Sequence, residues 1–424
     1  MVTRTPRGRG LGPAFTNIFV ANLSSSLGDG IAKTAIPLLA VRLTSDPLLI
    51  AGVSALAMLP WLLFAIPAGI LIDRIDRRVA LAASNSVRVA LAFVLLGLTA
   101  SGTLTIWWLY LVIFVYGACE TVYDGAIRAV VPSIVPREGL PKANSRIEAG
   151  ELVVQNFLSA PITSALFAVT ALIPLGLNGA VFAIAVGLAF FLPKAASGKQ
   201  FADHPDDAPV VWFRQLADGF RFIIANRMLR TLWFLSSFVG LAFAISTGGF
   251  VLYLLDRLEL PEALFGIFLL TGALGGILGS VVTSWLKNRY GAGPVMAVSS
   301  LVAGLTLAFV GLVPTLWAAG VGYFVMSGAV LVWNILVVSL RQSIIPGRLL
   351  GRVHGTWRTL LWGCTPIGAV IGGLLGRIDL TLPWIVGGAA ASIATLMWFR
   401  FLRSLPNPED VHNGDDPEVS AVAH

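Results

Sequence analysis

Charged residues are scarce in this sequence. Only 12% of its 424 residues are Asp, Glu, Lys or Arg, whereas 56% are hydrophobic, and the mean hydropathy is +0.83. Soluble domains carry about 25% charged residues, so the composition excludes a soluble enzyme with one membrane anchor. Apolar runs of the roughly 20 residues that cross a bilayer recur along nearly the whole chain. We therefore expect an all-α integral membrane protein.

Cysteine is also rare, and no pattern typical of a catalytic or cofactor site is found. The two cysteines, Cys119 and Cys364, lie in apolar stretches without CxxC or CxxH neighbours, so the sequence predicts neither a metal site nor a disulfide framework. A Walker motif and a glycine-rich phosphate loop with its lysine are missing, and we expect no ATP and no other cofactor. No catalytic triad is recognisable, so we do not expect an enzyme.

The net charge of +7 does not indicate a nucleic-acid partner, because the basic residues lie in short loops between apolar runs. With a cytoplasmic N-terminus, the loops on the opposite side hold little beyond Arg42, Arg257 and Arg377. This distribution follows the positive-inside rule. It predicts a multi-pass protein of the inner (plasma) membrane with both termini cytoplasmic.

Twelve apolar segments are predicted to be membrane helices, which form two six-helix pseudo-symmetric bundles. They lie near residues 15–43, 48–72, 79–101, 104–131, 143–171, 174–193, 228–255, 261–286, 293–313, 315–340, 353–376 and 381–402. The predicted domains are an N-terminal bundle over 1–193, a cytoplasmic linker with an interfacial helix over 194–226, a C-terminal bundle over 227–403, and a disordered cytoplasmic tail over 404–424.

The two halves resemble each other at an offset of 210 residues. The stretch Pro132–Ser145 reads PSIVPREGLPKANS, and Gln342–Gly355 reads QSIIPGRLLGRVHG. The same offset places Gly69 on Gly279. A repeat of six spans predicts two bundles that face each other across a central cavity, as in many transporters.

One loop carries a specific motif, GILIDRIDRR, between the second and third predicted spans. It resembles the signature loop of the major facilitator superfamily, G-x-x-x-D-R-x-G-R-R. The matching residues are Gly69, Asp73, Arg74, Arg77 and Arg78. Asp76 stands where the family has glycine, and we expect it to tolerate the left-handed backbone of a tight turn.

The resemblance implies that this loop is a gating latch. A carboxylate at a helix end can pair with arginines and face the positive N-terminus of another helix. By the resemblance, Asp73 holds one conformation closed against the eleventh span, near His354. Arg128 is a further gating candidate, and Glu148 is expected to meet a loop arginine such as Arg77. The alternative is that the loop arginines only set the membrane orientation.

Weaker similarities indicate the drug- and siderophore-exporting branch, which includes macrolide efflux pumps. The segment Ala160–Ala165, APITSA, keeps the proline of the antiporter pattern G-P-x-x-G-G, and the first span contains Gly28-Asp29-Gly30. The resemblance implies export of small lipophilic or cationic compounds by proton antiport. A siderophore exporter or a nutrient importer on the same fold remains open, as does a membrane scaffold or lipid-handling protein.

Ionisable residues inside membrane spans are functional candidates because they are costly in hydrocarbon. Asp29 lies about 18 Å into its span, and Lys33 follows at i+4, where the two can pair. Glu120, Asp124 and Arg128 are likewise spaced by four. We take Asp29, Glu120 and Asp124 as proton-coupling candidates, because burial disfavours the charged form of a carboxylate. In the alternative interpretation, Asp29–Lys33 and Asp124–Arg128 are structural pairs.

A further set of polar and aromatic residues could line a substrate cavity, although aromatic residues in spans also serve as packing. The set is Lys33, Tyr116, Tyr123, Gln155, Trp333, Asn334, Trp357, Arg358 and Trp362. Arg88 and Arg358 can each snorkel to the cytoplasmic interface. The expected partners are a small-molecule substrate, protons and the lipid bilayer, and we expect a monomer.

Overall fold

The computed structural model describes residues 11–197 and 212–411, apart from a few side chains within these ranges, among them that of Asp73. Every regular element in the described ranges is a helix, and no strand occurs there. The predicted tail is described only as far as Val411. The greater part of the linker loop, 198–211, lies outside the described residues.

The long helices follow the predicted spans closely. They are α1 (Pro13–Leu43), α2 (Pro47–Arg74), α3 (Arg77–Ala100), α4 (Ile106–Ile134), α7 (Leu172–Phe190), α9 (Arg227–Thr247), α11 (Glu262–Tyr290), α12 (Ala292–Leu312), α13 (Leu316–Ile344) and α14 (Gly347–Gly376). Hydrocarbon offers no hydrogen-bonding partner to the backbone, so a continuous helix is the conformation that such apolar segments adopt.

Three of the predicted spans are built from several pieces. The fifth consists of α5 (Leu140–Leu152), the π-helix η2 (Val153–Leu158) and α6 (Ser159–Val169). The seventh continues from α9 through α10 (Phe250–Leu252) into the π-helix η5 (Tyr253–Arg257). The twelfth comprises α15 (Leu382–Met397) and α16 (Phe399–Arg403). Short 3-10 turns, η1 (Arg137–Gly139), η3 (Lys194–Ser197) and η6 (Pro408–Asp410), lie in the connections.

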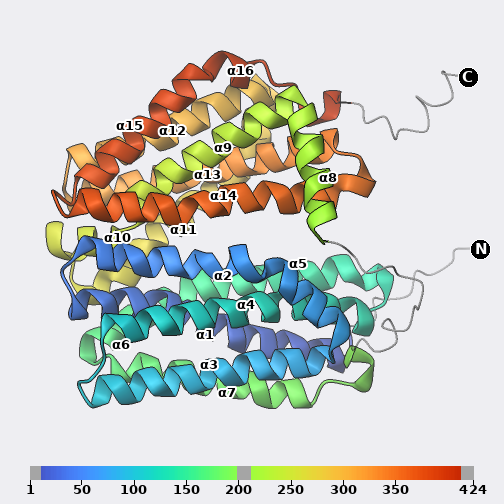
Figure 1. The fold of residues 1–424 in the computed structure, drawn as a ribbon, viewed down its shortest axis with the longest axis vertical. Helices are drawn as coiled ribbons and strands as arrows, with labels where there is room; N and C mark the ends of the chain where they lie inside the picture. Colours follow the sequence, from blue (N-terminus) through green and yellow to red (C-terminus); the bar gives the residue numbers. More distant parts are fainter. Residues whose placement is uncertain (1–10, 198–211, 412–424) are drawn as a thin grey trace, which may run out of the picture. The chain divides into compact units, whose positions relative to one another are not determined.

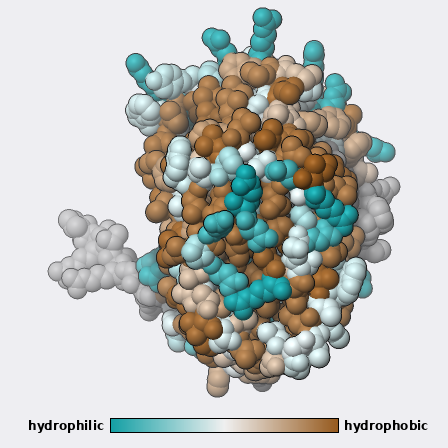
Figure 2. All heavy atoms as spheres, turned by 90° about the vertical axis from the view of Figure 1, so that its left-hand side faces the viewer, coloured by the Kyte–Doolittle hydropathy of each residue, from teal (hydrophilic) through white to brown (hydrophobic). Residues whose placement is uncertain are grey.

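Ten helical segments of the described chain are long and apolar enough to cross a membrane. Helix α15 is shorter, and α1, which contains Asp29 and Lys33, is not among the ten. The count of twelve spans therefore stays a prediction. Large apolar side chains such as Phe190, Phe191 and Ile378 are about three-quarters exposed, and apolar residues cover much of the visible surface in Figure 2. Such a surface is typical of helices that face lipid.

Contacts between helices divide the chain into two compact units (Figure 1). Unit 1 comprises Met1–Leu43, Leu63–Ala208 and Glu262–Gly266, and unit 2 comprises Thr44–Leu62, Pro209–Pro261 and Ile267–His424. The domain boundaries expected from the sequence remain a prediction.

In unit 1, helix α1 lies in the interior. It packs against α7, α6, η2, α5 and α4, while α3 packs against α7 and α4. Most residues in the middle of α1, including Ser25, Ser26 and Gly28–Ala32, are buried. Because the middle of α1 is enclosed by neighbours, its buried polar side chains, among them Asn22, Ser25 and Asp29, face other helices.

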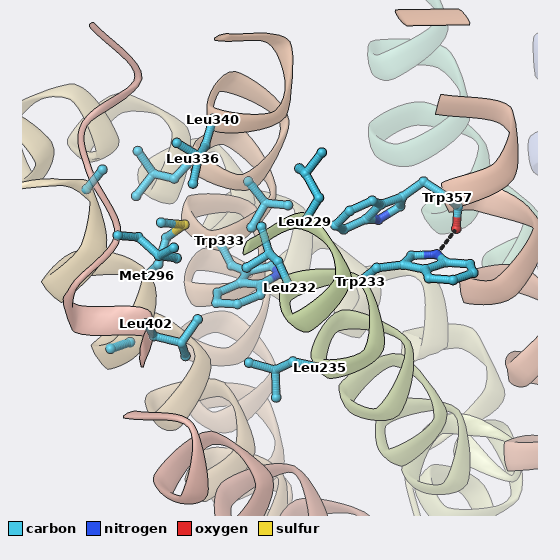
Figure 3. Packing of buried hydrophobic residues seen from close by; sticks show 14 of the residues in the cluster. Leu229, Leu232, Trp233, Leu235, Met296, Trp333, Leu336, Leu340, Trp357 and Leu402 are labelled. Carbon is cyan, nitrogen blue, oxygen red and sulfur yellow. Dashed lines mark hydrogen bonds between the residues drawn. The ribbon is translucent and has the colours of Figure 1, made fainter. Parts of the chain in front are cut away.

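In unit 2, α12 packs against α15 and α13, and α9 packs against α14 and α15. The helix α8 (Trp212–Ala225) forms within the segment predicted to be an interfacial helix and packs against α14 and α9. Figure 3 shows the core of this unit, in which the indole Nε1 of Trp233 donates a hydrogen bond of 3.3 Å to the carbonyl oxygen of Trp357. Trp333 and Trp357 are buried in this core, which favours a packing role for these two cavity candidates.

Candidate functional site: a buried charge cluster in unit 1

The centre of unit 1 contains a buried ion pair between Asp29 of α1 and Arg88 of α3. Nη1 of Arg88 lies 3.1 Å from Oδ1 of Asp29, and the side chains are 0% and 5% exposed for Arg88 and Asp29. The same Nη1 donates to Oγ of Ser25 at 3.2 Å and to Oδ1 of Asn85 at 3.4 Å. Ser25 also donates to Asn85 at 3.2 Å. Four polar residues from two helices thus form one enclosed network.

This pair corrects two sequence expectations. Asp29 pairs with Arg88 and not with Lys33, although Lys33 follows at i+4 on the same helix. Arg88 does not snorkel to an interface, because its side chain is fully buried. A carboxylate within hydrogen-bonding distance compensates the burial of a guanidinium, whereas Lys33 finds a different carboxylate.

Aromatic rings and close helix contacts fix this network. The guanidinium carbon of Arg88 lies 5.3–5.4 Å from the ring centroids of Tyr116, Tyr123 and Phe182, a distance at which a cation is attracted to a ring face. A Cβ atom at Gly28 would lie 2.4 Å from the Phe182 ring, and one at Gly30 would lie 2.1 Å from Oγ of Ser159. Glycine on both sides of Asp29 therefore permits α1 to approach its neighbours.

A second ion pair links Lys33 of α1 to Glu120 of α4. Nζ of Lys33 lies 2.9 Å from Oε1 of Glu120. The Lys33 side chain is 56% exposed and that of Glu120 is 14% exposed. This pair is therefore much more open than the pair of Asp29 and Arg88, although it lies one helical turn away along α1.

Two further carboxylates complete the cluster. Oε1 of Glu151 accepts a hydrogen bond of 2.8 Å from Nδ2 of Asn22. Asp124 follows Glu120 by one turn of α4 and interacts electrostatically with Glu120, Asp29 and Glu151. No ion pair joins Asp124 to Arg128 in the described part of the chain, and Arg128 is exposed. The expected structural pair of Asp124 and Arg128 is thus not formed in this structure.

The cluster holds more acidic than basic groups. Its carboxylates are those of Asp29, Glu120, Asp124 and Glu151, and its bases are Lys33 and Arg88. With four acids and two bases, the cluster has an excess of two negative charges when every group is ionised. Such an excess in an apolar bundle favours the uptake of cations, including protons.

The motif loop is shorter than predicted, because α2 runs through Gly69 to Arg74. Asp76 is extended (φ −63°, ψ 116°) and accepts a hydrogen bond of 3.0 Å from the Arg78 amide as the N-cap of α3. The expected left-handed turn is therefore wrong, and aspartate fits here as a capping residue. Asp76 also pairs with the Arg78 guanidinium at 2.8 Å.

Other latch candidates lie at this loop, and not all of them can be placed. Nη1 of Arg77 donates to the carbonyl oxygen of Ala129 in α4 at 2.8 Å. Arg74 and Glu148 are exposed. The side chain of Asp73 lies outside the described residues, so the latch expected from it remains a prediction.

The remaining cavity candidates lie in different environments. Gln155 is part of η2, and its carbonyl oxygen accepts a hydrogen bond from the Ser159 hydroxyl. In unit 2, the Arg358 guanidinium lies 4.2 Å from the ring centroid of Trp362. Asn334 is exposed on α13. Only Lys33, Tyr116 and Tyr123 of the cavity candidates belong to the charge cluster.

Sequence reasoning missed Asn22, Ser25 and Asn85 of the cluster, and it missed the pairing of Arg88. One signal was present, because Asn22, Ser25 and Asp29 recur at helical spacing on α1, and Asn85 and Arg88 are three residues apart on α3. Each helix thus carries a polar stripe in an apolar sequence. The stripes reveal that polar faces exist but not which faces meet.

A polytopic helical fold with charged residues inside an apolar bundle is typical of membrane transporters, in which such residues mark substrate or ion pathways. Residues 11–420 match the model of the transmembrane secretion effector family, and the chain belongs to this family of the major facilitator superfamily. It is a multi-pass membrane transporter and not an enzyme.

The chain is similar to curated exporters over most of its length. It is 22% identical to macrolide efflux protein A of Streptococcus pyogenes over 384 residues, which cover 88% of this chain and 92% of the relative. It is 25% identical to the enterobactin exporter EntS of Escherichia coli O1:K1 / APEC over 379 residues, 86% of each chain.

Solved structures confirm the fold. A bacterial homologue of the iron transporter ferroportin, in its inward-facing state, superposes with a TM-score of 0.72 at 19% identity, covering 94% of this chain and all of that one. The nucleoside transporter NupG superposes with a TM-score of 0.71 at 16% identity, over 93% of this chain and all of NupG. At such identities the likeness concerns the fold alone.

Proposed function

We propose that this transporter exports small lipophilic or cationic compounds from the cell in exchange for protons, by alternating access. It acts as a monomer in the bacterial plasma membrane, with both termini cytoplasmic, and does not use ATP. The relatives that are named as efflux proteins support the direction of transport. The observation that carries the proposal is the excess of carboxylates in the charge cluster of unit 1.

The cluster supports exchange because protons and cations compete for the same negative groups. A carboxylate in an apolar surrounding is stabilised either by a bound proton or by a nearby positive charge. When a substrate cation arrives beside Glu120 and Asp124, its charge compensates the carboxylate of Asp124, and a proton bound there leaves. When the cation departs on the other side of the membrane, a proton returns. Asp29, which is held beside Arg88, adds its negative charge to the electrostatic potential at these carboxylates.

The motif loop and the aromatic residues of unit 2 have supporting roles in this proposal. Gly69, Asp73, Arg74, Arg77 and Arg78 form the gating latch. The bond from Arg77 to the carbonyl oxygen of Ala129 ties this loop to α4, the helix that carries Glu120. A change in the loop would therefore reach the cluster through one rigid helix.

Further gating and cavity roles complete the proposal. Arg128 and Glu148 are exposed residues that contribute to gating. Trp362 and Arg358, which contact each other, offer an aromatic surface to lipophilic substrates.

Everted membrane vesicles test this function directly. An inside-acid gradient is established across vesicles that contain a pH-sensitive dye, and macrolides, lipophilic cations and siderophores are added in turn. Export into the lumen of the wild-type vesicles should release protons from it. The variants Asp29→Asn and Glu120→Gln should lose this release, while Glu138→Gln, which alters an exposed carboxylate of η1, should retain it.

The results distinguish proton-coupled export from uptake, from a role without transport and from a coupling site elsewhere in the protein. If no compound moves protons although the wild type is well expressed, proton exchange is excluded, and uptake or a role without transport takes its place. If release persists in both cluster variants, the cluster is not the coupling site.

Siderophore export is a second candidate, because the similarity to the enterobactin exporter extends over 86% of this chain. Proton release that is triggered by siderophores and not by lipophilic cations would favour it.

A further inference from the structure

We propose that Lys33 is a tethered stand-in for the positive group of the substrate. In this structure its ammonium contacts the carboxylate of Glu120, and a substrate cation displaces it and takes its place. This inference rests on the proposed function and narrows the substrate class to compounds that carry a positive charge. Lys33 is then a specificity residue, and Glu120 is the group that binds the substrate cation.

The two ion pairs of the cluster differ in how easily they can open. The pair of Asp29 and Arg88 is almost completely buried, and three aromatic rings surround its guanidinium. The pair of Lys33 and Glu120 has one contact at 2.9 Å, and more than half of the Lys33 side chain is exposed. Because more than half of the Lys33 side chain is not enclosed by neighbouring helices, its ammonium can leave Glu120 without disturbing the helix packing, and this second pair can exchange its cation.

The backbone at Lys33 is anchored on one side and loosened on the other. Upstream, Gly28 and Gly30 hold α1 against Phe182 and Ser159. Downstream, Pro37 lies within α1 and cannot donate the helical hydrogen bond to the carbonyl oxygen of residue 33. The flexible four-carbon stem of Lys33 therefore starts from a backbone that is held upstream and relaxed downstream, and its ammonium can swing away from Glu120.

The charges of the cluster favour a cation as the replacement. If Lys33 withdraws without a substitute, the carboxylates of Glu120, Asp124 and Glu151 face Arg88 as the remaining base beside Asp29. A substrate with one positive charge restores the original balance. Asp124 lies on the same face of α4 as Glu120, one turn away, so an arriving cation meets two carboxylates. A neutral or anionic compound gains no electrostatic binding free energy from these carboxylates.

Binding of two ions of similar size and opposite charge to the purified full-length protein tests the proposal. Tetraphenylphosphonium is the cationic probe, and tetraphenylborate is its anionic counterpart. Removal of the stand-in by Lys33→Gln should tighten tetraphenylphosphonium binding about tenfold, as expected when a competitor that is bound about nine-tenths of the time is deleted. Lys33→Arg should bind the probe with an affinity close to that of the wild type, and Glu120→Gln should bind it at least tenfold more weakly.

A matched control is Lys142→Gln, which removes an exposed lysine at the start of α5 and should leave both affinities unchanged. The thermal unfolding midpoint of each variant identifies loss of fold, and Lys33→Arg keeps the test usable if Lys33→Gln unfolds. Unchanged or weaker tetraphenylphosphonium binding by a folded Lys33→Gln variant overturns the proposal. An equal gain in the affinity of Lys33→Gln for tetraphenylborate also overturns the proposal, because the gain would then not depend on the charge of the probe.

The binding assay needs no proton gradient, so its failure is distinguishable from failure of the proposed function. Tighter tetraphenylphosphonium binding by Lys33→Gln, without proton release in wild-type vesicles, would support the stand-in and reject antiport. Proton release in wild-type vesicles, with unchanged tetraphenylphosphonium binding by Lys33→Gln, would support antiport and reject the stand-in.

Discussion

At the scale of single residues, the guanidinium of Arg88 meets Asp29 in a setting from which water is excluded. Bringing the two charges together there costs several kcal/mol of desolvation, which their attraction and hydrogen bonds offset. The compensation is incomplete, because Nε and Nη2 of Arg88 and Nδ2 of Asn85 have no hydrogen-bonding partner among the residues that the structure describes. Loss of one charge leaves the other buried alone.

We therefore predict that Arg88→Met lowers the free energy of unfolding by about 3–5 kcal/mol, the cost of breaking a buried ion pair. The double variant Asp29→Leu/Arg88→Met should regain most of this loss, because no isolated charge remains. Chemical unfolding of the purified protein in detergent measures both effects. A double variant that is as unstable as the single one would contradict the expected coupling.

Asp46 and Arg377 form a pair outside the membrane-spanning segments, and this pair predicts a dependence on pH. Arg377 donates to Oδ1 of Asp46 at 2.8 Å and to Oδ2 at 2.5 Å, and these bonds lower the pKa of the Asp46 carboxyl below its ordinary value. A lowered pKa means that the pair stabilises the fold above the ordinary pKa of about 3.9 and ceases to do so as the pH falls through the lowered value.

Asp46→Asn should accordingly lower the thermal unfolding midpoint at pH 7, and the difference from the wild type should shrink to nothing in acid, below the lowered pKa. The effect should be small because the pair is partly exposed. Midpoints measured in steps from pH 7 to pH 2 check this, with Asp410→Asn in η6 as a control carboxylate away from Arg377. A difference that grows toward acid pH would refute the role given to the pair.

At the scale of helices, the approach of α1 to η2 and α6 depends on Gly30. A methyl group at this position would lie 2.1 Å from the Ser159 hydroxyl and 3.1 Å from Cα of Gln155. The hydroxyl cannot move aside freely, because it donates to the carbonyl oxygen of Gln155. The helix pair therefore has no room for even the smallest side chain.

Gly30→Ala should lower the stability by about 1–3 kcal/mol, as expected of overpacking, and should also reduce transport because Asp29 shifts. Gly97→Ala in α3 is the matched control. A Cβ atom there meets nothing within 4 Å, and alanine favours a helix over glycine by about 0.5–1 kcal/mol. Equal effects of both substitutions on the unfolding midpoint would show that close packing at Gly30 is not the cause.

Helices were predictable from the sequence, whereas most partners of their polar residues were not. The length and apolar character of the segments suffice to define α2 or α12, because a continuous apolar run in lipid has no alternative to a helix. The spacing of Asp29 and Lys33 suggested a pair within α1, but both residues have better partners on α3 and α4. Which faces of two helices meet depends on packing, and packing is not visible in local spacing.

For the motif loop, the sequence likewise predicted the position but not the local contacts. Its charges marked the connection between two helices correctly, but aspartate in place of glycine changed the local geometry. Asp76 caps α3 and binds Arg78, a role that the residue type permitted and the family pattern concealed. The short hydrogen-bonding side chain of Asp76 determined the outcome there.

At the scale of the whole molecule, we predict that both termini face the cytoplasm. Fusion of a fluorescent protein that matures only in the cytoplasm should give bright cells at either terminus. Fusion of an alkaline phosphatase that is active only outside the plasma membrane should give an inactive enzyme at both. The same pair of reporters inserted after Ser101, between α3 and α4, should give the opposite result. Bright fluorescence at that position would refute the orientation.

The buried ion pairs also bear on how the protein is made. Helix α1 leaves the ribosome before α3 and α4, yet its Asp29 is neutralised by Arg88 of α3, and its Lys33 pairs with Glu120 of α4. A helix with both charges unmatched partitions poorly into lipid. Stable integration of α1 must therefore wait until α4 has been synthesised. Helix α1 is thus translated before the two helices on which its stable insertion depends.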